Sequence, residues 1–251
     1  MSSQLRCTSQ TLDNPHLKRE YNQELFTEIA HAYSIVTGLL SWGRDRFWKR
    51  ELITLLPQME NPRALDLACG TGDITKLLSC RYPQGYICGI DLTKAMLDPA
   101  RISTSGTNMS FHLSDMCRLA FRDESFDIIT GGYALRNAPE LETALKEIHR
   151  VLKPNGTAAF LDFSRSPSIF ISSIHLSLLT LWGYFWGLVL HRNPHTYGYI
   201  AKSLSHFPNR DKLMQLFEKQ GFRTISTQRR FFGFAEITVV RKLDHHRSSA
   251  R

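Results

Sequence analysis

Residues 63–91 of the chain read RALDLACGTGDITKLLSCRYPQGYICGID. Residues 64–68 form a short apolar run, and Gly70-Thr71-Gly72 follows it directly. Two glycines one residue apart permit positive φ and remove the Cβ atoms, so that a ligand can lie against the backbone. Helical spacing resumes after the glycines, and residues 86–90 form a second apolar run. This order predicts a strand, a glycine turn, a helix and a second strand of an α/β fold.

Acidic residues in this stretch indicate the class of ligand. Asp91 ends the second strand, and an acid at that position can accept hydrogen bonds from both ribose hydroxyls of a nucleoside. A dinucleotide fingerprint needs a third glycine, where this chain has Thr75. The carboxylates of Asp66 and Asp73 would repel a pyrophosphate, but they suit a ligand that carries sulfonium and ammonium groups. The pattern is similar to the S-adenosylmethionine (SAM) site of class I methyltransferases; a glycine turn without a ligand is the alternative.

Composition limits the class of protein. A chain of 251 residues is one large domain or one domain with an insertion. The five cysteines form no C-x-x-C pair, which argues for the reducing cytoplasm and against a metal or disulfide framework. The net charge of +8 permits contact with an anionic membrane surface. No nucleic-acid partner is expected, because the basic residues are spread along the chain and no N-P-P-Y-type target-base motif is present.

The remaining elements alternate, which predicts a parallel sheet. We expect a helix that stops near Pro99, followed by strands 109–113, 128–130 and 157–163, with a helix at 141–152 and a turn at 153–156 before the last strand. Asp115 follows the third strand of the chain, where the adenine amino group of a nucleoside would need an acceptor. At the N-terminus we expect a flexible tail over residues 1–20 and a helical lid over residues 21–56 that brings Tyr33 to the substrate.

Several longer motifs identify a family resemblance. GTGDIT, GIDLTKAML, ALRNAPELETALKEIHRVLKPNG and LDFS are similar to motifs of the ubiquinone/menaquinone biosynthesis C-methyltransferases, and the resemblance runs from about Glu24 to Val240. It implies a Rossmann-like class I methyltransferase sheet of seven mostly parallel strands, with a reversed hairpin at 222–226 and 235–241. The domain would then cover residues 21–241, and residues 242–251 would form a flexible tail.

The resemblance also implies an activity, which is the SAM-dependent methylation of a carbon of a polyprenylated benzoquinol or naphthoquinol, with demethylmenaquinol favoured. Residues at matching positions would bind SAM: Asp66, Gly70, Gly72, Thr75, Asp91, Leu92, Asp115, Met116 and Gly132. Tyr33, Arg136 and Asn137 would line the reacting ring. Arg136 would stabilise a phenolate there, and Tyr33 or a water held by Asn137 would relay the proton.

Two departures from the family pattern bear on the substrate. The family usually has Y-D-x-M-N where this chain has residues 33–37, YSIVT, and often has S-F-G-L-R-N where this chain has residues 132–137, GYALRN. These changes leave the cofactor interpretation intact and keep two alternatives open. One is a C-methyltransferase for another lipophilic aromatic or prenylated molecule. The other is a catalytically silent scaffold of a quinone-synthesis complex; a homodimer is also expected.

Residues 169–190, IFISSIHLSLLTLWGYFWGLVL, contain no Asp, Glu, Lys or Arg. They are long enough to span a bilayer, but serines and a histidine interrupt the first half, and the methyltransferase pattern resumes afterwards. We therefore expect residues 164–206 to be a substrate-side insertion, an apolar lid that grips a prenyl tail or makes peripheral contact with a membrane. A spanning helix is the alternative.

Overall fold

The computed structural model describes residues 7–102, 108–165, 169–194 and 196–244. The strands are β1 Arg63–Leu67, β2 Tyr86–Asp91, β3 Met109–Leu113, β4 Phe126–Gly132, β5 Leu152–Phe163, β6 Phe222–Arg230 and β7 Ala235–Lys242. The α-helices are α1 Ser9–Asp13, α2 Pro15–Ile29, α3 Tyr33–Leu40, α4 Asp45–Thr54, α5 Asp73–Arg81, α6 Lys94–Ile102, α7 Ala134–Asn137, α8 Leu141–Val151, α9 Ile169–His191, α10 Gly198–His206 and α11 Arg210–Lys219. Ala30–Ala32 and Phe231–Gly233 are short 3₁₀ helices.

The strands form one seven-stranded sheet in the order β3-β2-β1-β4-β5-β7-β6. The first five strands are parallel, and β7 runs antiparallel to both of its neighbours. The predicted seven-stranded, mostly parallel sheet with a reversed C-terminal hairpin is therefore confirmed, although β6 is longer than expected. Leu67 pairs with Ile90 on one side and Gly131 on the other, and Asp91 pairs with Leu113. The carboxyl ends of four strands consequently meet at one edge of the sheet.

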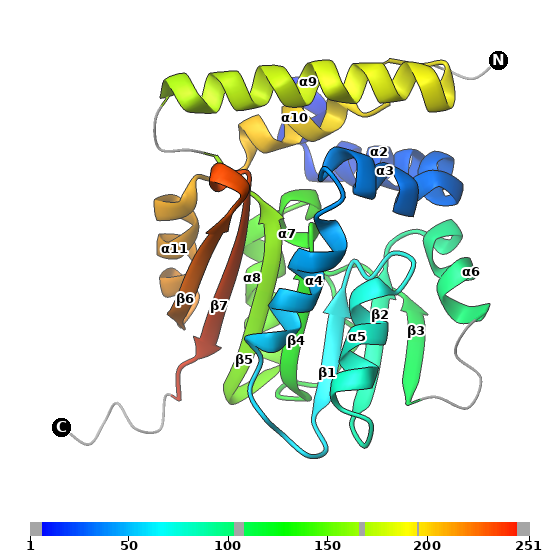
Figure 1. Cartoon of the computed structure of the whole chain (residues 1–251). Helices are drawn as coiled ribbons and strands as arrows, with labels where there is room; N and C mark the ends of the chain where they lie inside the picture. Colours follow the sequence, from blue (N-terminus) through cyan, green and yellow to red (C-terminus); the bar gives the residue numbers. More distant parts are fainter. Residues whose placement is uncertain (1–6, 103–107, 166–168, 195, 245–251) are drawn as a thin grey trace.

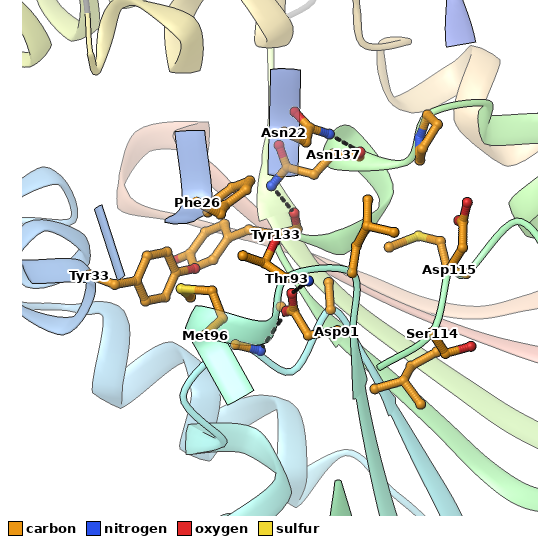
Figure 2. A pocket seen from close by; sticks show the side chains of 17 residues that line it. Asn22, Phe26, Tyr33, Asp91, Thr93, Met96, Ser114, Asp115, Tyr133 and Asn137 are labelled. Carbon is orange, nitrogen blue, oxygen red and sulfur yellow. Dashed lines mark hydrogen bonds between the residues drawn. The ribbon is translucent and has the colours of Figure 1, made fainter. Parts of the chain in front are cut away.

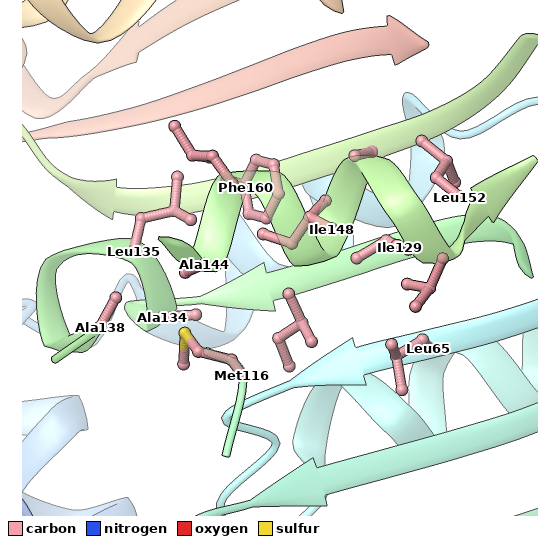
Figure 3. Close-up of a cluster of buried hydrophobic side chains, with 14 of the residues drawn as sticks. Leu65, Met116, Ile129, Ala134, Leu135, Ala138, Ala144, Ile148, Leu152 and Phe160 are labelled. Carbon is pink, nitrogen blue, oxygen red and sulfur yellow. The ribbon is translucent and has the colours of Figure 1, made fainter. Parts of the chain in front are cut away.

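Helices cover both faces of the sheet, and further helices lie over its carboxyl edge (Figure 1). On one face, Ile148 of α8 belongs to a buried cluster with Ile129 of β4 and Phe160 of β5 (Figure 3). On the other face, Trp48 of α4 and Leu78 of α5 belong to a second buried cluster. These helices bury one apolar stripe each, which is what amphipathic spacing in the sequence predicts.

The expected flexible tail over residues 1–20 is wrong for the residues that the structure describes. α2 begins at Pro15, six residues before the predicted start of the domain at residue 21. Asn14 caps the helix, because its Oδ1 accepts hydrogen bonds from the backbone N–H groups of His16 and Leu17 at 3.0 and 3.2 Å. Leu12 of α1 is buried in the cluster that α2, α3 and α10 share. At the other end, β7 continues to Lys242, and residues 245–251 of the expected tail lie outside the described residues.

Two predicted boundaries are also wrong. α6 does not stop at Pro99 but continues to Ile102, because Leu97 and Ala100 are buried beneath Phe111 of β3 and this packing offsets the one backbone hydrogen bond that proline removes. Residues 153–156 do not form a separate turn, since β5 already begins at Leu152. In place of the predicted turn, the structure has an irregularity in the pairing of β4 with β5, where the register shifts between Phe126 and Ile128.

The N-terminal cap gives a direct test of the corrected boundary. Asn14→Ala should lower the free energy of unfolding by about 0.5–2 kcal/mol, which is the usual cost of losing an N-cap side chain. Asn209→Ala is the matched control, because Asn209 caps α11 through the backbone N–H of Lys212. Chemical denaturation should show similar losses in both variants. A loss for Asn209→Ala alone would mean that residues 15–20 contribute nothing to the folded state.

Candidate functional site

A cavity lies at the carboxyl edge of the sheet, over β1, β2 and β4; we call it the strand-end cavity (Figure 2). Six of the nine residues predicted to bind a cofactor line it: Gly70, Asp91, Leu92, Asp115, Met116 and Gly132. They come from loops that follow different strands, so the parallel register brings them together. The sequence prediction of a binding site at this edge is therefore matched by a cavity built from the expected residues.

Asp91 forms the polar centre of the strand-end cavity. Its Oδ2 accepts a hydrogen bond from the backbone N–H of Gly70 at 2.9 Å, and its Oδ1 accepts one from the backbone N–H of Thr93 at 2.8 Å (Figure 2). Burial raises the pKa of Asp91 to about 6, and these backbone hydrogen bonds oppose the rise. A carboxylate has about four acceptor sites, so Asp91 retains acceptors for hydroxyl groups of a ligand.

The two glycines of the loop have different surroundings. Gly70 lines the cavity at φ +55°, and a Cβ atom there would come within 3.0 Å of the Met96 side chain. Gly72 has φ +83° and lies under the ring of Phe111, which a Cβ atom would approach to 3.0 Å. Gly72 thus allows the loop to pack on β3, and its predicted contact with a cofactor stays a prediction.

Asp66 and Thr75 lie beneath the loop rather than in the strand-end cavity. Thr75 Oγ1 donates to Asp66 Oδ2 at 2.7 Å, and Thr130 Oγ1 donates to Asp66 Oδ1 at 2.9 Å. Asp66 also lines a small neighbouring space, the glycine-loop cavity, together with Lys49 and Asp73. Burial raises the pKa of Asp66 to about 7, although the threonine hydroxyls lower it. The observed role of this pair is to fix the loop; direct cofactor contact stays a prediction.

Asp115 has a partner that the sequence did not suggest. Its Oδ2 accepts from Nε of Arg19 on α2 at 2.6 Å, and its Oδ1 accepts from the backbone N–H of Cys117 at 2.8 Å. α2 therefore borders the strand-end cavity, where it also contributes Asn22 and Phe26. These residues were missed because nothing in the local pattern connects α2 with a loop about ninety positions away.

The three residues predicted to be catalytic lie together in a second space, the helix-side cavity. Tyr33, Arg136 and Asn137 line it, and most other walls are apolar side chains of α2, α3 and α10: Leu25, Ile29, Val36, Leu40 and Ile200. Tyr33 and Asn137 also line the strand-end cavity, as do Phe26 and Tyr133. The two cavities are thus adjacent and share one wall.

Arg136 is buried, with 4% of its surface exposed. Its Nε donates to Asp162 Oδ1 at 3.3 Å, its backbone N–H donates to Asp162 Oδ2 at 3.1 Å, and Nη1 donates to Ser203 Oγ. Burial raises the pKa of Asp162 even though Arg136 opposes the rise. The ion pair of Arg136 with Asp162 therefore lies inside the protein, at a wall of the helix-side cavity.

Asn137 is fixed by three hydrogen bonds. Its Nδ2 donates to the carbonyl of Tyr133 at 2.8 Å, and its Oδ1 accepts from Tyr199 Oη at 3.0 Å. Its own carbonyl accepts from Nδ2 of Asn22 at 2.8 Å. The side chain is therefore held in one orientation between the two cavities.

Tyr133, Asp45 and Lys49 form a buried polar chain that sequence reasoning did not assign to the site. Tyr133 Oη donates to Asp45 Oδ1 at 2.9 Å, and Lys49 Nζ lies 2.7 Å from Asp45 Oδ2 and 2.9 Å from Asp73 Oδ2. The i, i+4 spacing of Asp45 and Lys49 was the only available signal. The chain joins α4 to the glycine loop behind Tyr33, whose pKa burial raises to about 12.

The buried carboxyl of Asp66 predicts a pH dependence of stability. Its pKa is higher in the folded state than in the unfolded state, so the folded state binds more protons between the two values. Stability should therefore fall as the pH rises from about 4 to 7, by at most about 1.4 kcal/mol per pH unit from this group. Asp66→Asn, which stays neutral, should show a flatter profile in denaturation experiments. Parallel profiles for both proteins would show that Asp66 is ionised throughout.

Comparisons with known proteins agree with this geometry. The family model described as the ubiE/COQ5 methyltransferase family matches residues 15–242. The chain is 32% identical to a demethylmenaquinone methyltransferase of Roseiflexus castenholzii over 232 residues, 90% of this chain and 95% of the relative. It is 33% identical to that of Lactobacillus johnsonii over 221 residues, 86% of this chain and 90% of the relative.

Solved structures show the same fold. A Haloferax volcanii methyltransferase, solved in complex with the Trm112 activator, has a TM-score of 0.64 at 18% identity and covers 87% of this chain and 98% of its own. A SAM-dependent methyltransferase from Aquifex aeolicus has a TM-score of 0.57 at 16% identity and covers 80% of this chain and 92% of its own. The chain therefore belongs to the ubiE/COQ5 methyltransferase family and is a SAM-dependent methyltransferase.

Proposed function

We propose that the protein methylates a ring carbon of a polyprenylated quinol, with demethylmenaquinol as the favoured acceptor, in menaquinone biosynthesis. The observation that carries the proposal is the pair of adjacent cavities. The strand-end cavity contains a buried carboxylate with spare acceptors, and the helix-side cavity joins apolar walls to one guanidinium. The names of the relatives supply the acceptor class.

We assign SAM to the strand-end cavity. Asp91 would accept the ribose hydroxyls, while Gly70 leaves room for the ligand beside the loop. When bound, SAM supplies an electrophilic methyl group on its sulfonium. Asp115 keeps its predicted role near the adenine, and Arg19 holds its carboxylate in place.

We assign the acceptor to the helix-side cavity. Its leucine, isoleucine, valine and aromatic walls exclude water and would hold a ring with the start of a prenyl chain. A ring carbon becomes nucleophilic as a neighbouring hydroxyl loses its proton, and the buried guanidinium of Arg136 would stabilise that developing phenolate. Tyr33 stays protonated because burial raises its pKa to about 12, so it can donate a hydrogen bond to the same oxygen. Asn137, between the cavities, would hold the water that receives the proton.

Two neutral substitutions distinguish the roles of the two cavities. Replacing the buried ion pair with Arg136→Gln and Asp162→Asn removes the positive charge without leaving an unpaired carboxylate. Transfer of the methyl group to a short-tailed demethylmenaquinol should then fall by about a hundredfold or more, the usual cost of losing one transition-state donor. SAM affinity should stay within about threefold, a change of less than about 1 kcal/mol.

Asp91→Asn is the complementary variant, and it should lose SAM affinity by about tenfold or more. Calorimetry with SAM and turnover with labelled SAM measure the two properties in the same preparations. Unchanged turnover in the Arg136→Gln/Asp162→Asn protein would reject the assigned acceptor site. Turnover with another aromatic acceptor, but with neither a naphthoquinol nor a benzoquinol, would favour the alternative of a different lipophilic substrate.

We also propose a peripheral membrane contact through α9 for a cytoplasmic protein. Among the described residues, one segment, Ser172–His191, is long and apolar enough to cross a membrane. Its inner side is attached to the protein: Leu179 is buried, and Trp182 Nε1 donates to the carbonyl of Leu39 on α3 at 3.1 Å. Its outer side exposes Leu181 and Leu188 by 67% and 57%. One covered and one exposed face is the pattern of an interfacial helix.

The exposed face of α9 should bind vesicles reversibly. Alkaline carbonate should release the protein from membranes, and Leu181→Gln with Leu188→Gln should abolish sedimentation with vesicles while SAM affinity stays unchanged. These residues line neither proposed binding cavity. Retention in the membrane pellet after carbonate, without aggregation, would instead support a spanning helix. The expected homodimer stays a prediction.

A further inference from the structure

An open groove of about 1060 Å³ lies between α9, α3, α4 and α5, on the outside of the two proposed binding cavities. We call it the outer groove. It shares no lining residue with the strand-end cavity or with the helix-side cavity. It does share Lys49 and Asp73 with the glycine-loop cavity, and this ion pair forms the wall between the two. The methylation reaction as proposed makes no use of the outer groove.

One end of the outer groove is aromatic and apolar. Trp42 stacks on Trp182 of α9 with ring centroids 5.1 Å apart and planes 6° apart. Trp186, Ile35 and Leu39 complete this end. Trp42 is 59% exposed and Ile35 is 61% exposed, so a substantial apolar surface lies open beside the exposed face of α9, where α9 crosses α3 (Figure 1).

The other end of the outer groove is basic. Arg46, Lys49 and Arg50 of α4 and Lys76 of α5 line it, and the groove as a whole has four cationic side chains against two carboxylates. Both carboxylates, Asp45 and Asp73, already contact Lys49.

Arg46 and Arg50 are exposed, and within the described part of the chain neither forms an ion pair. They are four positions apart on one helix, an arrangement of like charges that disfavours the helix slightly. An anion bound between them would offset that repulsion.

We propose that the outer groove binds one anionic phospholipid, with its phosphate at Arg46 and Arg50 and an acyl chain along the tryptophans. The neutral quinol has no charge that would match the basic end, and a free inorganic anion has no surface that would match the apolar end. An anionic headgroup satisfies the excess of cations, whereas a choline group would bring a further cation toward them. Because the apolar end adjoins α9, this site rests on the proposed membrane contact and deepens it. α9 would contact the bilayer, and the outer groove would make the protein prefer membranes that contain anionic lipid.

A monomeric lipid tests binding to the outer groove independently of binding to a membrane. Dihexanoyl phosphatidylglycerol, below its critical micelle concentration, should bind in calorimetric titrations. The affinity for dihexanoyl phosphatidylcholine should be lower by at least about tenfold. Arg46→Gln with Arg50→Gln should weaken binding of the anionic lipid by about tenfold or more. Arg223→Gln with Arg241→Gln is the matched control, because it removes the same charge from a paired position of β6 and β7 that does not line the outer groove. It should change binding by less than about threefold.

Each other outcome contradicts a specific part of the proposal. Equal affinity for the two lipids, equal loss in both double variants, or inorganic phosphate binding as tightly as the anionic lipid would overturn the outer groove as a phospholipid site. Vesicles of phosphatidylcholine are the last comparison. They carry no anionic lipid, so they test the membrane contact of α9 without the outer groove. If they bind the protein while the monomeric anionic lipid does not, the groove proposal fails and the membrane contact stands. If the monomer binds and no vesicle does, the membrane contact fails instead.

Discussion

The hydrogen bond from the backbone N–H of Gly70 to the carboxylate of Asp91 joins the glycine loop after β1 to the end of β2. Burying a carboxylate is unfavourable unless donors satisfy it, and here two backbone N–H groups do so. The loop is therefore held open above the strand ends by the same group that would receive the ribose. The positive φ of Gly70 allows the loop to adopt this geometry. The shape of the strand-end cavity therefore depends on both the sheet edge and the loop.

A second layer of buried charge fixes the acceptor side. The pairs Arg136–Asp162 and Lys49–Asp45 are each enclosed by protein. Buried ion pairs gain little net stability over apolar substitutes, so their presence beside two cavities is better explained by orientation than by stability. Arg136 of α7 is fixed by Asp162 of β5, at the position proposed for the phenolate. Lys49 is held by Asp45 on its own helix, α4, and its second contact, with Asp73, joins α4 to the start of α5 directly after the glycine loop.

The helices over the sheet edge relate the proposed acceptor site to the proposed membrane contact. α10 and α3 wall the helix-side cavity, and α9 packs on both of them while leaving an apolar face exposed. In the proposed arrangement, the cofactor would enter at the strand ends, and the lipophilic quinol would approach from the side of α9.

The sequence by itself determined the alternating strands and helices of the sheet and Asp91 at the tip of β2, because these follow from local periodicity. The reversed hairpin and the grouping of Tyr33 with Arg136 and Asn137 came from the family resemblance, because no local pattern joins positions 33 and 136. The sequence predicted a helical lid over residues 21–56, but not the contacts that α2 makes at the site. The contacts of Arg19 with Asp115 and of Asn22 with Asn137 join segments about a hundred positions apart, and a polar helix with weak apolar spacing resembles a tail until its partners are known. The same reason hid Tyr133 and its bond to Asp45. Only tertiary packing decided which face of α9 is covered, because residues 169–190 contain no Asp, Glu, Lys or Arg that would mark one side as exposed.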